Sequence, residues 1–131
     1  MIKKTVTYTD FNDIQRTEDF YFNLTEAELA EMEVSEGGSF KAMLEKIIKE
    51  DDHKRIIEYF KHIVLMSYGE KSADGRRFVK SEEIRNGFAP TEAYSKIFME
   101  LANDAKAASE FVKGIMPANV SAQVDAVKAN N

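Results

Sequence analysis

The spacing of apolar and polar residues changes along this chain, from the period of strands to the period of helices. From Lys3 to Thr9 the two kinds of side chain alternate, as they do in a strand with one buried face. A turn-forming run at residues 10–13 follows, and Gln15 to Phe22 again favours a strand. We therefore predict a β-hairpin over residues 1–24. Because two strands alone are only marginally stable, the hairpin must pack on helices or on another chain.

A helix is expected directly after the hairpin. Thr25 and Glu28 have the spacing of a capping box, in which each side chain bonds the backbone N–H of the other residue. Leu24 before the cap and Leu29 after it form a hydrophobic staple. The helix should run to about Val34, ahead of a pair of glycines.

Two further helices and a turn-rich connector follow. Apolar stripes at helical spacing cover Phe40 to Ile48 and Ile56 to Val64, with Ile57 on the second stripe. Gly69 is the expected end of the second of these helices. Residues 77–79 read as a short extended piece, and Ser81 with two acidic residues behind it opens a short helix.

The last helix is expected to be long. Thr91 is its N-cap, and an apolar stripe runs from Tyr94 to Ile115 without losing its phase at Asn103-Asp104. This continuity predicts one helix of about 22 residues, ending near Gly114. Residues 118–131 are polar and weakly periodic, so we expect a mobile tail.

These elements predict a mostly helical α+β fold. It consists of the hairpin (1–24) and a small helical bundle (25–117) with a long C-terminal helix. Residues 1–117 form a single domain in this interpretation, and 118–131 form the tail. A chain of 131 residues is the size of one domain.

Charge and composition exclude several classes of function. The net charge of −5 disfavours nucleic-acid binding, because phosphates would be repelled. The best basic candidate, Lys71, Arg76, Arg77 and Lys80, is interrupted by acidic residues and reads as a solvated loop. There is no cysteine, hence no disulfide and no thiolate chemistry.

We expect a cytoplasmic protein with no membrane association. The N-terminus lacks the apolar core of a signal peptide, and the longest apolar run is Ile63 to Met66.

No catalytic, cofactor-binding or metal-binding residues are expected. The two histidines, His53 and His62, are poorly placed to share a metal ion, and no nucleophile or phosphate-loop motif is present. An enzyme of an unrecognised type remains a competing hypothesis. A ligand-dependent rise in melting temperature would favour it.

Aromatic residues give the one candidate binding surface. Around the connector lie Tyr68, Phe78, Phe88 and Tyr94, with the adaptable side chain of Met99 nearby. One hypothesis is a patch that receives an apolar helix of a partner. The alternative, which we favour, is that these side chains pin the connector to the core.

The same region resembles a known family. The resemblance lies in the runs Tyr68-Gly69-Glu70-Lys71, Gly75-Arg76-Arg77-Phe78, Gly87-Phe88, Thr91-Glu92-Ala93-Tyr94, Phe98-Met99-Glu100-Leu101 and Ala108-Ser109-Glu110-Phe111-Val112-Lys113-Gly114-Ile115. As a set they are similar to the small tail assembly chaperones of siphophages that infect Gram-positive hosts. The N-terminal half matches that family in organisation more than in residues.

The resemblance implies a non-enzymatic role with no cofactor. Such proteins bind the apolar, helical tape measure protein, keep it soluble in the host cytoplasm, help recruit the major tail protein and are absent from the virion. It leaves self-association open. A competing hypothesis is a small phage-encoded acidic inhibitor or adaptor that binds a host protein, although a nucleic-acid decoy would need more negative charge than −5.

Overall fold

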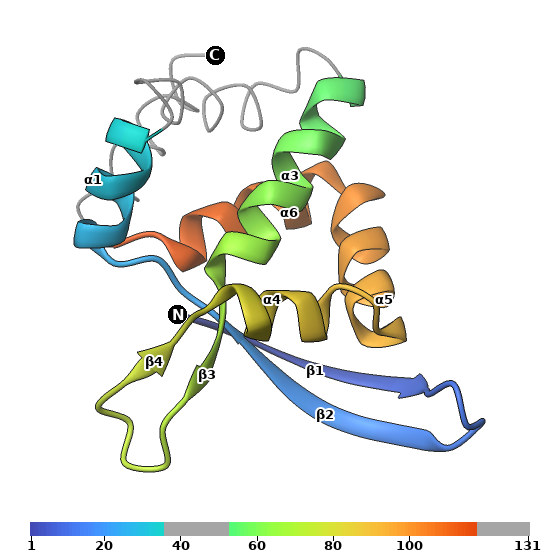
Figure 1. Cartoon of the computed structure of the whole chain (residues 1–131). Coiled ribbons are helices and arrows are strands. Elements are labelled where there is room, and N and C mark those ends of the chain that lie inside the picture. The colour runs from blue at the N-terminus through green and yellow to red at the C-terminus, as the bar shows by residue number, and fades with distance from the viewer. Residues whose placement is uncertain (36–52, 118–131) are drawn as a thin grey trace.

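The computed structural model describes residues 1–35 and 53–117, which form a four-stranded sheet covered by helices (Figure 1). In chain order the elements are β1 (Ile2–Thr9), β2 (Gln15–Phe22), α1 (Glu26–Ser35), α3 (His53–Ser67), β3 (Tyr68–Lys71), β4 (Phe78–Val79), α4 (Glu82–Phe88), α5 (Glu92–Ala102) and α6 (Ala105–Ile115). In Figure 1 the helices lie on one side of the strands. The predicted mostly helical α+β fold is confirmed.

The predicted hairpin is the largest part of the sheet. β1 and β2 pair antiparallel along their whole length, from Ile2 opposite Phe22 to Thr9 opposite Gln15. Its buried face carries Val6 and Tyr8, while Thr5, Thr7 and Thr9 are exposed, because successive side chains point to opposite faces of a strand.

The connector adds two strands, so that the sheet order is β1-β2-β3-β4. β4 confirms the predicted extended piece. The expected helix end at Gly69 is wrong, because α3 ends at Ser67 and Gly69 lies in β3 opposite Tyr21. A side chain at Gly69 would meet the Phe78 ring and the Val79 carbonyl oxygen at 2.9 Å, so this close strand pairing requires glycine.

Helix starts follow the capping signals closely. The Thr25 N–H donates to the Glu28 side chain at 3.0 Å and the Glu28 N–H donates back to Thr25 at 3.2 Å, which confirms the capping box. Ser81 and Thr91 cap α4 and α5 by accepting from Ile84 and Tyr94. These caps fix the residue at which each of the three helices begins.

The single long C-terminal helix is a wrong prediction. α5 ends at Ala102 and α6 begins at Ala105, with the Asp104 side chain accepting hydrogen bonds from Lys106 and Ala107 as the N-cap of α6. Both helices bury apolar faces against the same core, for example Ile97 in α5. The apolar stripe therefore keeps its phase although the backbone breaks.

A closed circuit of aromatic rings forms much of the core. Successive ring centroids lie 5.3–6.3 Å apart around the series Phe22, Phe111, Phe60, Phe98, Tyr94 and Phe88. Edge-to-face and tilted contacts at this range are favourable beyond the burial of area. The circuit joins the sheet to α3, α4, α5 and α6.

Three other expectations have different outcomes. Ile57, placed on the buried stripe of α3, is 45% exposed, so that assignment is wrong. The predicted helix over Phe40 to Ile48 and the predicted tail over 118–131 lie outside the described residues.

Within the described part of the chain, no helix is long and apolar enough to cross a membrane.

Candidate functional site

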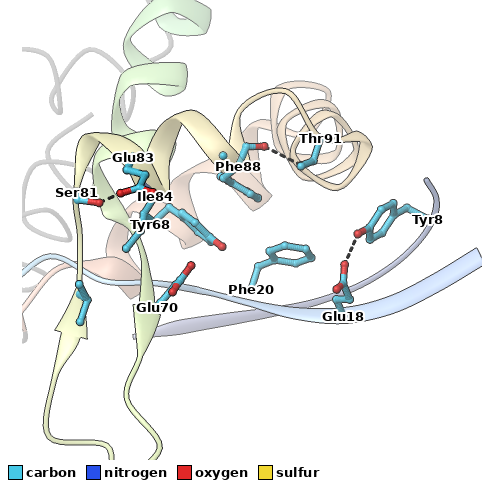
Figure 2. Close-up of a pocket in the computed structure, with 12 residues that line it drawn as sticks. Tyr8, Glu18, Phe20, Tyr68, Glu70, Ser81, Glu83, Ile84, Phe88 and Thr91 are labelled. Atoms are coloured by element: carbon cyan, nitrogen blue, oxygen red, sulfur yellow. Dashed lines mark hydrogen bonds between the residues drawn. The ribbon is translucent and has the colours of Figure 1, made fainter. Parts of the chain in front are cut away.

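An open groove of about 650 Å³ lies between the sheet and α4 (Figure 2). We call it the aromatic groove. Its lining comes from the hairpin, from β3 and β4 and from α4 with the turn behind it: Tyr8, Glu18, Phe20, Tyr68, Glu70, Val79, Ser81, Glu83, Ile84, Gly87, Phe88 and Thr91.

Strand pairing and helix caps bring these distant segments together. Phe22 pairs with Tyr68, which sets β3 beside β2 and places Tyr68 next to Phe20. Ser81 then starts α4 above β3, and Phe88 at the end of α4 packs down onto Tyr68. The groove is thus the space that remains where a short helix crosses the edge of the sheet.

The floor of the groove is made of aromatic rings. Tyr68 and Phe88 stack face to face, with centroids 3.9 Å apart and planes at 14°. Phe20 lies between Tyr68 and Tyr8, at 6.4 Å and 6.5 Å from their rings, as Figure 2 shows. Phe20 and Tyr68 are half-buried, so both rings still present apolar surface to the groove.

Carboxylates form the rim. Glu18, Glu70 and Glu83 are exposed residues on three different elements, β2, β3 and α4. The Tyr8 hydroxyl donates a hydrogen bond to Glu18, and this bond raises the pKa of Tyr8 above its ordinary value. Burial, with the charges of Glu70 and Glu18, raises the pKa of Tyr68. Both tyrosines therefore remain neutral hydrogen-bond donors at neutral pH.

The basic residues of the connector are directed to other parts of the molecule. The Lys80 ammonium lies 2.6 Å from Glu28 at the start of α1 and also donates to the Asn23 carbonyl. Lys71 lies over the Tyr21 ring, 4.9 Å from its centroid. Lys71 and Lys80, two of the four basic residues considered as a phosphate site, are therefore held by different partners.

The five predicted partner-binding residues do not form one patch. Tyr68, Phe88 and Tyr94 pack together, and Tyr68 and Phe88 line the groove. Phe88 is only 3% exposed, which places it mainly in the core. Phe78 packs over Gly69.

Met99 lies elsewhere, in a second hollow of about 470 Å³ between β1 and α5. Its side chain is 49% exposed. This hollow is lined by the apolar side chains of Val6, Ile97 and Met99, by short polar side chains, and by Lys96 and Glu100 of opposite charge.

Of the groove residues, sequence reasoning identified only Tyr68 and Phe88 as site residues. The aromatic and acidic residues that it missed are Tyr8, Glu18, Phe20, Glu70 and Glu83. Tyr8 and Phe20 could have been found as same-face aromatics of the predicted hairpin. The carboxylates could not, because acidic residues occur throughout the chain and only the fold selects these three.

The groove offers binding surface more than reaction chemistry. Aromatic faces next to carboxylates can hold an apolar or cationic side chain. In residues 1–35 and 53–117, no three potential metal ligands come close enough to share an ion.

Comparison with known proteins assigns the chain to a family. A family model described as phage tail assembly chaperone matches residues 1–131, the whole chain. No curated protein and no solved structure shows a significant match. The chain belongs to the phage tail assembly chaperone family.

Proposed function

We propose that this protein binds the tape measure protein of its phage, keeps it soluble before the tail polymerises and helps recruit the major tail protein. The observation that carries the proposal is the family match over the whole chain. Membership gives the protein a chaperone role in tail assembly, inside the infected host and with tail proteins as partners. The family resemblance implies that the tape measure protein is long, helical and apolar. Of the tail components it would therefore have the most need of a chaperone.

The proposal extends to the type of phage and the fate of the protein. The connector runs that resemble the siphophage proteins favour a long-tailed phage of a Gram-positive host. The protein acts by binding alone, in the cytoplasm, and leaves before the virion is complete.

The surface of the molecule suits this task. The aromatic groove exposes apolar ring surface next to charged groups, so it can receive part of an amphipathic helix. The net charge of −5 keeps a protein with such exposed apolar surface from self-aggregating. Several copies along one tape measure chain would gain avidity from individually weak contacts.

Co-expression tests the proposal. The tape measure protein from the same genome is produced alone, with this chain, and with an unrelated acidic protein of similar size as control. We expect this chain to raise the soluble yield of the tape measure protein and to co-purify with it. An insoluble tape measure protein in all three cultures would contradict the proposal.

A further inference from the structure

We propose that the aromatic groove binds a segment of a partner protein that presents an arginine or lysine flanked by apolar side chains. The inference deepens the proposed function and rests on it, since it specifies which parts of a tail protein this chaperone would hold. It follows from the charge of the groove together with the chemistry of its floor.

The charged side chains that line the groove are all negative. Glu18, Glu70 and Glu83 line it, and none of its lining residues is Lys, Arg or His. Among the described residues, neither Glu70 nor Glu83 has a cation within ion-pair distance. Three carboxylates around one groove give it a negative potential, which would attract a cation supplied by a partner.

Nearby cations that could have neutralised the rim from within are held elsewhere. Lys80 is paired with Glu28, Arg16 with Asp10 at 2.6 Å, and Lys71 lies over the Tyr21 ring. Lys80 and Lys71 are thereby held outside the groove lining. Arg16 lies opposite Tyr8 in the hairpin, at the end of the groove near Glu18, and its guanidinium is bound to Asp10.

The floor favours the same occupant. Phe20 and Tyr68 are half-buried rings, and the charges of Glu70 and Glu18 are close enough to act on Tyr68. A guanidinium or ammonium group can lie over an aromatic face while it pairs with a carboxylate, and its apolar neighbours can cover the remaining ring surface. A purely apolar segment would instead leave the carboxylates of the rim beside dehydrated surface, which costs free energy.

The net charge of the chain acts in the same direction. At −5, the molecule attracts cationic segments over distances longer than a contact, and this attraction raises the rate of encounter. The groove adds a place where such a segment can stay bound.

The test uses the purified full chain and overlapping peptides of about 20 residues, long enough to form a helix on binding, that span the tape measure protein of the same genome. Each peptide that binds is also made with its arginines and lysines replaced by glutamine. Binding is located by the changes in amide chemical shift of the chain.

Two variants report on the groove. The rim variant carries both Glu70→Gln and Glu83→Gln, which removes two rim charges. The matched control, Glu82→Gln with Glu110→Gln, removes the same charge at exposed positions outside the groove lining. Glu82 precedes Glu83 in the first turn of α4, so the effect on the helix dipole is also matched.

We expect basic, apolar peptides to bind with shifts at Phe20, Tyr68 and Glu83, and their glutamine versions to bind far less tightly. The rim variant should weaken binding roughly three- to tenfold, and the control variant less than about twofold. Raising the salt from about 50 to about 500 mM should weaken binding to the wild type more than to the rim variant.

Three results would overturn the inference: no peptide binds, the bound peptides are acidic or uncharged, or the shifts map outside the groove. A concentration-dependent dimer with shifts in the groove and no competition by peptide would also overturn it, because a second copy of the chain would then be the occupant. The co-expression experiment decides the proposed function separately. Rescue of the tape measure protein without binding in the groove leaves that function standing, whereas groove binding without rescue removes it.

Discussion

The rings of Tyr68 and Phe88 lie face to face with centroids 3.9 Å apart and an angle of 14° between their planes. Tyr68 belongs to β3 and Phe88 to α4, so the stack fastens the connector helix to the edge of the sheet. It also forms part of the floor of the aromatic groove. One contact thus stabilises the fold and shapes the candidate binding surface.

Replacing Phe88 with alanine should destabilise the protein. Phe88 is 3% exposed and contacts the rings of Phe20, Phe22, Tyr68 and Tyr94. Loss of a buried Phe side chain costs about 3–5 kcal/mol in unfolding free energy. Urea denaturation measures the loss.

The matched control for this experiment is Met99→Ala, a large apolar side chain that is 49% exposed. It should change the unfolding free energy by less than about 0.5–1 kcal/mol. A Phe88→Ala protein with the stability of the wild type would show that the ring serves the surface and not the core.

Asp104 should be the residue that starts α6. Its side chain accepts from the backbone N–H groups of Lys106 and Ala107, each at 3.1 Å. Asp104→Ala should cost about 1 kcal/mol, while Asp104→Asn should retain most of the stability because asparagine also caps well. Equal losses in the two variants, measured by thermal unfolding, would contradict the capping role.

Glu28 should make stability depend on acid pH. Burial would raise the pKa of its carboxyl, but the hydrogen bonds from Lys80 and from Thr25 lower it overall below the ordinary value of 4.5. A carboxyl with a lowered pKa in the folded state contributes stability above its unfolded pKa. That contribution is lost as the pH falls through the folded value.

The wild type should therefore be more stable than Glu28→Gln at neutral pH, and the difference should shrink below about pH 4.5. Glu26→Gln, at an exposed position on the same helix, is the control and should show little of this pH dependence. A Glu28→Gln difference that stays constant from neutral to acid pH would show that the ion pair does not set the carboxyl's pKa.

Ser109→Ala should stabilise the protein. Ser109 lies in α6, is 5% exposed, and its Oγ has no hydrogen-bond partner among the described residues. Removing an unsatisfied buried hydroxyl and introducing a better helix former should together gain about 0.5–1.5 kcal/mol. A loss of stability in chemical denaturation would indicate that the hydroxyl has a partner.

The sequence predicted local structure well because its signals act over a few residues. The alternation in β1 and the caps at Thr25, Ser81 and Thr91 each depend on neighbours within a turn or a strand, and each was confirmed. The break at Asp104 was missed because an apolar stripe reports which positions face the core. It does not report whether the backbone between them is continuous.

The aromatic groove could not be predicted in the same way. It exists because β3 pairs with β2, which brings Glu70 beside residues about 50 positions earlier in the chain, and because α4 then crosses them. Tyr68 and Phe88 were identified from the clustering of aromatics around the connector. Glu18 in β2 and Glu83 in α4 could not be identified, because they become groove residues only when these elements pack beside β3.

The most direct test of the chaperone role is the soluble yield of the tape measure protein when it is co-expressed with the wild type, the rim variant or its matched control. We predict high yield and co-purification with the wild type and with Glu82→Gln/Glu110→Gln, and a clear decrease with Glu70→Gln/Glu83→Gln. Tape measure protein that remains insoluble with all three, while each chaperone itself is folded, would contradict the account.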